Sequence, residues 1–358
     1  MPKFLILDIG AGTLDILFYD TDTNLHYKAV VRSPVSTVAD EAALLPGDLL
    51  VVGTEMGGGA VAQVLRRRAQ EGRVVMSRSA APTVHHNLER VVSQGIEVVE
   101  DAVAEELRRS PGFSVLTLGD LEAARVKRIV EGMGIPFSFH GIGICAQDHG
   151  VAPEGMSHLD YRHSLFKASL ECDPFPHSLL FRAQELPGTF SRLTAICRSA
   201  SALPAEEIFV MDSGMAAVLG ASLDIRAAGK QRILTLDVAT SHTVGAVLED
   251  GELCGFFEYH TEGLTRERLA GLVTDLADGN LTHGQILAEG GHGAYIRRAP
   301  GFGSMAVIVA TGPKRGLVGG IQPPWVYGGP LGDNMMTGTA GVLEAIRRRM
   351  GLPPIPYL

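Results

Sequence analysis

Residues 7–16, LDIGAGTLDI, place two aspartates, two glycines and a threonine between two apolar runs. The flanking runs, 3–9 and 14–20, are rich in β-forming residues, and the glycine turn between them predicts an antiparallel hairpin. Small residues let backbone N–H groups approach phosphate oxygens closely, and an aspartate beside them can hold a hydrated Mg²⁺. The simpler alternative is a tight turn that needs glycine dihedral angles and an Asx-type hydrogen bond.

Outward from this hairpin, strands and helices alternate. The sequence predicts a helix over 57–72, a helix that Asp120 caps and that ends near Gly132 or Gly134, and a strand from about 136. Residues 149–187 carry proline, histidine and charge without periodicity, which indicates loops around one helix near 161–171. Such alternation is typical of an α/β fold with largely parallel strands.

The opening unit recurs later in the chain. Residues 232–259 again give an apolar strand that ends in an aspartate, Asp237, followed by a small-residue turn, a second strand and a third. Two such units imply duplicated domains that face a shared cleft. Because 358 residues exceed what one core usually supports, we expect two domains, 1–228 and 229–358.

Composition narrows the class of protein. A net charge of −9 argues against binding to nucleic acid or to anionic membranes, because both require excess Lys and Arg on the contacting face. The four cysteines are far apart, which favours neither a disulfide framework nor a zinc knuckle and indicates a reducing compartment. The first apolar run is too short for a signal peptide, and no run reaches the length of a membrane span. We therefore expect a cytoplasmic enzyme.

Three segments carry a resemblance to a known superfamily. LDIGAGTLDI resembles the first phosphate motif of the actin, seventy-kilodalton chaperone and sugar-kinase ATPases, and LDVATSHTVGAV (236–247) resembles the second. MAVIVATGPKRG (305–316) is similar in placement to the strand that meets adenosine. The resemblance implies an α/β, two-lobe, ribonuclease H-like (actin-like ATPase) fold around a central cleft, with the last helix, near 338–350, returning to the first lobe. It also implies ATP and Mg²⁺ as cofactors.

The same resemblance implies the residues that would hold Mg²⁺-ATP. Asp8 and Asp237 would hold Mg²⁺ through water. The residues expected to bind the cofactor are Asp8, Gly10, Gly12, Thr13, Asp237, Thr240, Ser241, Thr311 and Gly312. The chain departs from the superfamily in its second turn, where Ala239, Thr240, Ser241 and His242 replace glycines, and near Gly312, where a glycine pair is expected.

A further resemblance extends over most of the chain. The segments QDHG (147–150), FFEYHT (256–261), EGGHG (289–293), TGPKR (311–315) and GDNMMTG (332–338) resemble a family labelled "putative pyruvate formate-lyase activating enzyme", a domain of unknown function. Radical activases of that kind need three closely spaced cysteines for an iron–sulfur cluster. The cysteine spacing here therefore argues against a radical S-adenosylmethionine activase and leaves open an ATPase that activates another enzyme.

Gln147, Asp148 and His149 follow a predicted strand and are candidates for catalysis. The carboxyl end of a strand is where an open α/β sheet places reactive groups, and phosphoryl transfer needs a group that orients or deprotonates the attacking oxygen. The resemblance implies Asp148 or Gln147 for this role, with His149 as a second base. In the alternative, Asp148 only caps the following turn and His149 only packs beneath it.

Four histidines lie at the ends of apolar runs, near predicted turns: His149, His242, His260 and His292. A transition-metal site needs three such groups to converge, and the alternative is that each is hydrogen-bonded or exposed singly. His260 and Glu258 are two residues apart and so share one face of a strand.

Three functions are consistent with these features. The first is an ATPase whose lobe closure drives a partner protein, the second is a kinase of a small hydroxylated or carboxylated metabolite, and the third is a histidine-rich, metal-dependent hydrolase on the same scaffold. The partners expected are a nucleotide and either a small molecule or a protein.

Overall fold

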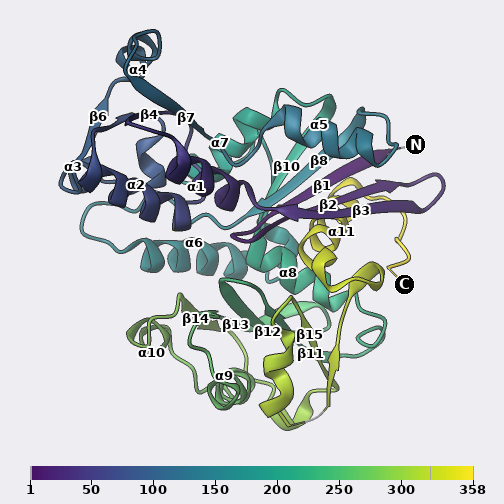
Figure 1. Ribbon diagram of the computed structural model, residues 1–358. Helices are drawn as coiled ribbons and strands as arrows, with labels where there is room; N and C mark the ends of the chain where they lie inside the picture. The colour runs from purple at the N-terminus through teal and green to yellow at the C-terminus, as the bar shows by residue number, and fades with distance from the viewer. Residues whose placement is uncertain (1, 323, 358) are drawn as a thin grey trace.

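In the computed structural model, which describes residues 2–322 and 324–357, the strands form two six-stranded sheets and one four-stranded sheet. The two larger sheets lie one above the other, and each forms the centre of one lobe. Helices lie between the two sheets (Figure 1). One hydrophobic core cluster contains residues of both large sheets, a second covers the other face of the second large sheet, and the four-stranded sheet has clusters of its own.

The first large sheet has the strand order β3-β2-β1-β8-β10-β9. The first three strands are antiparallel neighbours, whereas β1, β8 and β10 are parallel. Its strands are β1 (Lys3–Ile9), β2 (Thr13–Asp20), β3 (Leu25–Arg32), β8 (Phe139–Ala146), β9 (Leu180–Arg182) and β10 (Ala205–Asp212). The hairpin predicted around 7–16 is present. The following strand, β3, is not evident from the sequence because it is half exposed and mixes polar and apolar residues.

The second large sheet has the order β14-β13-β12-β11-β15-β16. Its strands are β11 (Arg232–Val238), β12 (His242–Glu249), β13 (Glu252–His260), β14 (Gly293–Ile296), β15 (Val307–Thr311) and β16 (Trp325–Tyr327). The five strands from β13 to β16 repeat the order and directions of the five from β3 to β10. This duplicated topology confirms the predicted two-lobe, ribonuclease H-like fold.

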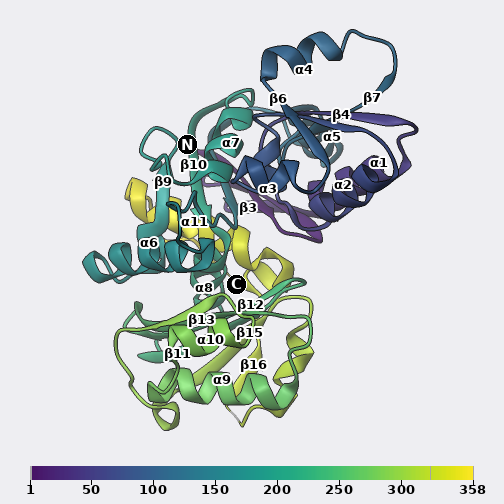
Figure 2. The same cartoon turned by 90° about the vertical axis from the view of Figure 1, so that its left-hand side faces the viewer.

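The four-stranded sheet is a separate unit inserted between β3 and β8. All its pairings are parallel, in the order β6-β5-β4-β7, and it lies beside the first lobe on the side away from the second (Figure 2). Its elements are α1 (Pro34–Leu44), β4 (Asp48–Gly53), α2 (Gly59–Glu71), β5 (Val74–Ser77), α3 (Leu88–Val92), β6 (Ile96–Val99), α4 (Asp101–Leu107) and β7 (Phe113–Leu118). The helix predicted over 57–72 is present as α2, but the sequence does not predict that this unit leaves the main sheet.

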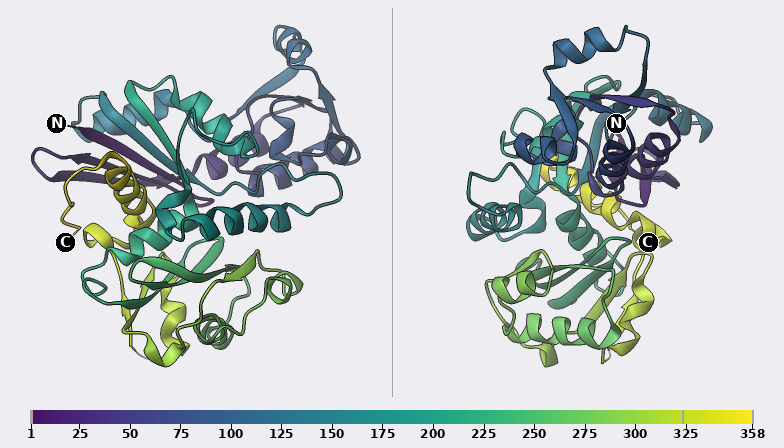
Figure 3. Two further views of the ribbon diagram at one scale, coloured as in Figure 1. Left: turned by 180° about the vertical axis from the view of Figure 1, so that it is seen from behind. Right: turned by 60° about the vertical axis from the view of Figure 1, so that its left-hand side comes forward.

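The remaining helices cover the sheets and the boundary between the lobes. The α-helices are α5 (Ala123–Gly132), α6 (His158–Cys172), α7 (Ser191–Ala200), α8 (Ser213–Ser222), α9 (Arg266–Asp278), α10 (His283–Ala288) and α11 (Thr337–Met350). Short 3₁₀ turns are η1 (Ala81–Thr83), η2 (Pro176–Leu179), η3 (Phe302–Ser304), η4 (Arg315–Gly320), η5 (Pro330–Gly332) and η6 (Asn334–Met336). Helix α6 runs between the lobes (Figure 3). Within the described ranges, no helix has the length and apolar character needed to cross a bilayer.

The expectation that Asp120 caps α5 is wrong. The helix begins after Glu122, which makes no side-chain cap. The Asp120 carboxylate instead accepts two hydrogen bonds from the Arg192 guanidinium, at 2.7 and 2.8 Å. A paired arginine from α7 outcompetes a local cap because a two-point charged contact is stronger than one backbone hydrogen bond.

The last helix, α11, returns to the first lobe, as the resemblance implies. It lies beside β1 and β2 and packs against α8 (Figure 1). The approach to α8 is so close that a Cβ on Gly220 would lie 1.8 Å from the carbonyl oxygen of Thr337, and one on Gly341 would lie 1.8 Å from that of Ala216. These two glycines therefore allow α8 and α11 to pack backbone against backbone.

Candidate functional site

A cleft of about 620 Å³ lies where the turns of the two duplicated hairpins meet. The turn between β1 and β2 touches the turn between β11 and β12: a Cβ on Gly12 would lie 3.3 Å from Oγ1 of Thr240. The predicted site residues that line this cleft are Asp8, Gly10, Gly12, Thr13, Gln147, Asp148, His149, Asp237, Thr240, Ser241, His242, His260, His292 and Gly312. The volume is within the range of small-molecule sites.

Thr311 is placed differently from the other predicted residues. It is fully buried at the end of β15, where its hydroxyl donates a 2.8 Å hydrogen bond to Oδ1 of Asp237. Thr311 therefore orients Asp237 from behind, and its neighbours Gly312 and Pro313 form the cleft wall.

Two aspartates face each other across the first hairpin. Asp8 on β1 pairs directly with Asp15 on β2, an arrangement that repels like charges. Burial and then neighbouring carboxylates raise the pKa of Asp8 to about 7 and that of Asp15 to about 8. Asp15 is 6% exposed, and its Oδ1 has no hydrogen-bond partner within the described chain.

Asp237 brings a third carboxylate from the second lobe. Burial raises its pKa to about 6, although the hydrogen bond from Thr311 opposes the shift. Among the ion pairs of the described residues, none involves Asp8, Asp15 or Asp237. The cleft thus gathers three carboxylates that lack a basic partner in that part of the chain.

The first turn of α11 packs directly against the side chain of Asp8. A Cβ on Gly338 would lie 1.9 Å from Oδ2 of Asp8, so only glycine allows this approach. The amino-terminal end of a helix carries partial positive charge, which stabilises a nearby carboxylate. Gly338 is therefore a positioning residue for Asp8.

Two other buried acids near the cleft, Asp212 and Glu258, share a basic partner. Arg162 on α6 donates to Asp212 at 2.8 Å and to Glu258 on β13, so it joins the two lobes. Burial opposes ionisation of Glu258, but the charge of Arg162 holds its pKa well below the usual range. Arg162 is not among the residues that the sequence indicates, because its partners lie 50 and 96 residues away.

Gln147, Asp148 and His149 all line the cleft after β8, but their roles differ. Both carboxylate oxygens of Asp148 accept backbone N–H groups, from Gly150 at 2.8 Å and from Leu193 at 2.9 Å. This is the capping arrangement considered as the alternative. Gln147 donates its amide N–H to Oε1 of Glu258. Burial lowers the pKa of His149 well below its usual range, so its ring is neutral at neutral pH.

Changing Asp148 to Asn should lower the free energy of unfolding by roughly 1–3 kcal/mol, since the amide group can accept only one of the two backbone hydrogen bonds. Urea unfolding measures this loss, with Asp40→Asn on the exposed face of α1 as the matched control. If Asp148→Asn is as stable as wild type but loses turnover, the carboxylate acts in catalysis rather than as a cap.

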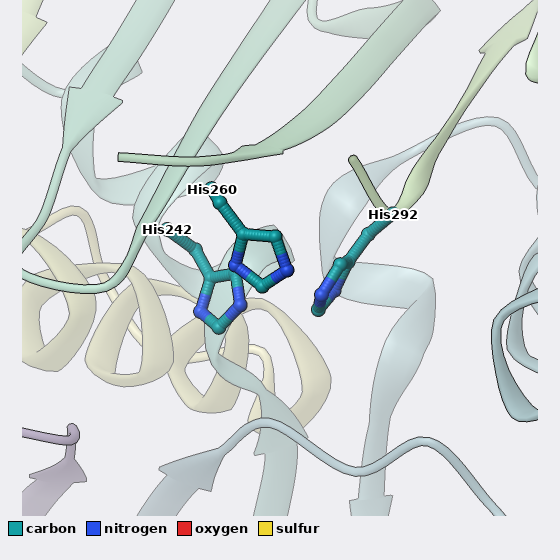
Figure 4. Close-up of side chains that lie close together, drawn as sticks. All are labelled: His242, His260 and His292. Carbon is teal, nitrogen blue, oxygen red and sulfur yellow. The ribbon is translucent and has the colours of Figure 1, made fainter. Parts of the chain in front are cut away.

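Three of the four predicted histidines form a compact group. The ligating atoms of His242, His260 and His292 lie within 4.8 Å of one another, and the three rings stand side by side (Figure 4). The ring of His149 is 5.2 Å from that of His292. Burial lowers the pKa of His242 to about 4, which keeps its ring neutral.

Within the described residues, no other group of three or more His, Cys, Asp or Glu side chains gathers its ligating atoms this closely. The four cysteines are free thiols and none belongs to the group. The described chain therefore offers no three-cysteine site for an iron–sulfur cluster.

A second set of histidines, which the sequence does not single out, lines another part of the cleft. His85 and His86 follow η1, and the ring of His158 at the start of α6 is 5.4 and 5.3 Å from theirs. Nε2 of His86 lies 2.8 Å from Oε1 of Glu55. These residues come from segments without strand periodicity, so no local pattern predicts that they meet.

One protein-family model matches this chain. A family model described as "Putative pyruvate format-lyase activating enzyme (DUF1786)" matches residues 56–317, well over half of the chain. No curated protein matches the chain.

Similar solved structures include three full-length matches. The inorganic polyphosphate/ATP-glucomannokinase from Arthrobacter sp. strain KM is 12% identical, with 98% of this chain and 100% of that chain covered and a TM-score of 0.38. The ROK hexokinase from Thermus thermophilus is 14% identical, with 96% and 98% covered and a TM-score of 0.34. The PilM-PilN type IV pilus biogenesis complex is 11% identical, with 98% of both chains covered and a TM-score of 0.39. Identities and scores this low transfer neither a substrate nor a partner.

Proposed function

The chain belongs to the family described as "Putative pyruvate format-lyase activating enzyme (DUF1786)", and from its cleft we propose that this member binds Mg²⁺-ATP and hydrolyses or transfers the terminal phosphate. The observation that carries the proposal is the set of three carboxylates, Asp8, Asp15 and Asp237, beside the glycine turn of the first hairpin.

These carboxylates fit a hard divalent cation. Mg²⁺ prefers oxygen ligands and usually keeps several waters, so it is bound through one or two carboxylates and the phosphates of the substrate. The unpartnered, buried Oδ1 of Asp15 supplies a free acceptor in the same cleft. Mg²⁺ would neutralise phosphate charge and would offset the repulsion between Asp8 and Asp15.

The two hairpin turns fit the phosphate groups. Gly10, Gly12 and Thr13 from the first lobe face Thr240 and Ser241 from the second across the cleft. The first turn is braced from below, because Ser33 donates its hydroxyl to the carbonyl of Gly10 at 2.6 Å. We expect the turn backbones to bind phosphate oxygens and the wall at Gly312 to contact the nucleoside.

Gln147 is the group best placed to orient the attacking oxygen. Its amide N–H is held by Glu258, which is itself held by Arg162. The amide oxygen of Gln147 then remains to accept a hydrogen bond from water or from an acceptor hydroxyl, as phosphoryl transfer requires. Asp148 is the weaker candidate because its two oxygens already accept backbone N–H groups.

Calorimetry and product analysis test the proposal. We expect ATP to bind in the presence of Mg²⁺ and to bind much more weakly with excess chelator. Phosphate release without an acceptor would identify an ATPase that acts on a partner protein, whereas a phosphorylated metabolite in a mixture of hydroxylated and carboxylated compounds would identify a kinase. Failure to bind ATP at millimolar concentration with Mg²⁺ present would refute the proposal. Chelator-sensitive hydrolysis without nucleotide would favour the metal-dependent hydrolase instead.

A further inference from the structure

The group of His242, His260 and His292 follows from the register of three neighbouring strands. His242 begins β12 and His260 ends β13, and the two residues pair directly across that antiparallel hairpin. His292 immediately precedes β14, and its backbone N–H donates to the carbonyl of Glu258 at 2.8 Å. Because β13 pairs with both β12 and β14, the three imidazoles meet at the same end of the sheet (Figure 4).

In two of these imidazole rings, Nδ1 makes a polar contact, which leaves Nε2 available to a metal. Nδ1 of His242 lies 3.0 Å from the hydroxyl of Ser241, and Nδ1 of His292 lies 3.1 Å from Oε1 of Glu258. A histidine that binds a metal almost always donates its second nitrogen to a carboxylate, a carbonyl or a similar group, which sets the orientation of the ring. His292 and Glu258 have this arrangement.

Nε2 of His242 is buried and has no hydrogen-bond partner within the described residues. A buried nitrogen that lacks a partner destabilises the fold, so a ligand at this atom would remove a penalty. Arg162 donates to the other carboxylate oxygen of Glu258, so both oxygens of that carboxylate have partners.

We propose that His242, His260 and His292 bind a divalent transition metal of the zinc class, separate from the carboxylate site of Asp8. Imidazole nitrogen suits zinc and its neighbours in the first transition row, whereas Mg²⁺ takes oxygen ligands. Three histidines are the ligand set of an open, catalytic-type zinc site, in which a fourth position takes water or substrate.

The fourth position would be reached from the cleft. All three histidines line it, and His260 is exposed at the rim. An oxygen of a substrate, such as a carboxylate or phosphate oxygen, could bind there within the same cavity that holds the turn of the first hairpin. The metal would thus contribute to substrate binding in addition to the proposed Mg²⁺-ATP site.

Metal titration of the chelator-treated protein, without nucleotide, tests this inference. We expect one Zn²⁺ per chain by elemental analysis, and Co²⁺ should give visible d–d absorption bands that Zn²⁺ abolishes. His242→Gln and His292→Gln should each weaken binding at least about 100-fold, and Ser241→Ala about 10-fold because it loosens the His242 ring. His26→Gln, on β3 and outside the cleft, is the matched control, and circular dichroism checks that each variant folds.

Other results would overturn the inference. Less than about 0.2 equivalents of Zn²⁺ on the wild-type protein would do so. Wild-type affinity in His242→Gln and His292→Gln, with loss in His86→Gln, would place the metal at the second histidine set. The Asp8→Asn variant should bind Zn²⁺ with wild-type affinity even where it no longer binds Mg²⁺-ATP. The proposed ATP site and the proposed metal site can therefore fail independently.

Discussion

Asp8→Asn is expected to weaken Mg²⁺-ATP binding about 100-fold, because it removes one of the charges around the cation while keeping the shape of the side chain. The fold should be unaffected or more stable, since burial disfavours the charged carboxylate, as the raised pKa of Asp8 shows, and an amide carries no charge. Calorimetry with ATP and Mg²⁺ measures the affinity, and thermal unfolding measures the stability.

The matched control is Asp40→Asn, whose side chain is 57% exposed and pairs with Arg32 on the surface. It should bind Mg²⁺-ATP as wild type does. Unchanged affinity in a folded Asp8→Asn variant would exclude a cation at this carboxylate. Asp237→Asn should resemble Asp8→Asn, because Asp237 approaches the same cleft from the second lobe.

Gly338→Ala is expected to reduce the same affinity by about 10- to 100-fold, because it displaces the carboxylate of Asp8. The added Cβ would lie 1.9 Å from Oδ2 of Asp8, and real Cβ atoms do not approach so closely. Either the Asp8 side chain rotates away or the start of α11 moves, and both displace the carboxylate. Overpacking of this kind costs roughly 1–3 kcal/mol of unfolding free energy.

Gly132→Ala provides the comparison for the Gly338 variant. Gly132 is the last residue of α5 and has no atom within 4 Å of an added Cβ, so alanine there should leave binding unchanged. If Gly338→Ala binds Mg²⁺-ATP like Gly132→Ala, the position of Asp8 against α11 does not matter for the ligand.

Much of the fold follows from short-range patterns. The apolar runs at 3–9 and 232–238 each end in an aspartate and a turn of small residues, and they form the central strands of the two sheets. Because the strand period and the turn residues are local, the sequence predicts these hairpins and their duplication. The separate four-stranded sheet is not predicted, since nothing local determines which parallel strand β4 pairs with.

The candidate site is predicted only in part for the same reason. The sequence indicates Asp8, Asp237 and the histidines because each stands at the end of an apolar strand. Arg162 lies within a helix whose surroundings read as loops, and its role depends on partners in both lobes. Contacts between residues so far apart in the sequence depend on tertiary packing, and the local spacing of residues does not predict them.

The return of α11 to the first lobe has a consequence for the order in which the protein acquires its structure during synthesis. Val342 and Ile346 cover Gly143 on β8, and Gly338 seats Asp8 on β1, yet these pairs are separated by about 200 residues or more. The amino-terminal sheet leaves the ribosome first but lacks its covering helix until residues 337–350 have been translated. Contacts of such long sequence separation slow folding and leave an apolar face uncovered meanwhile. Nascent chains that stop before residue 337 should therefore depend on chaperones.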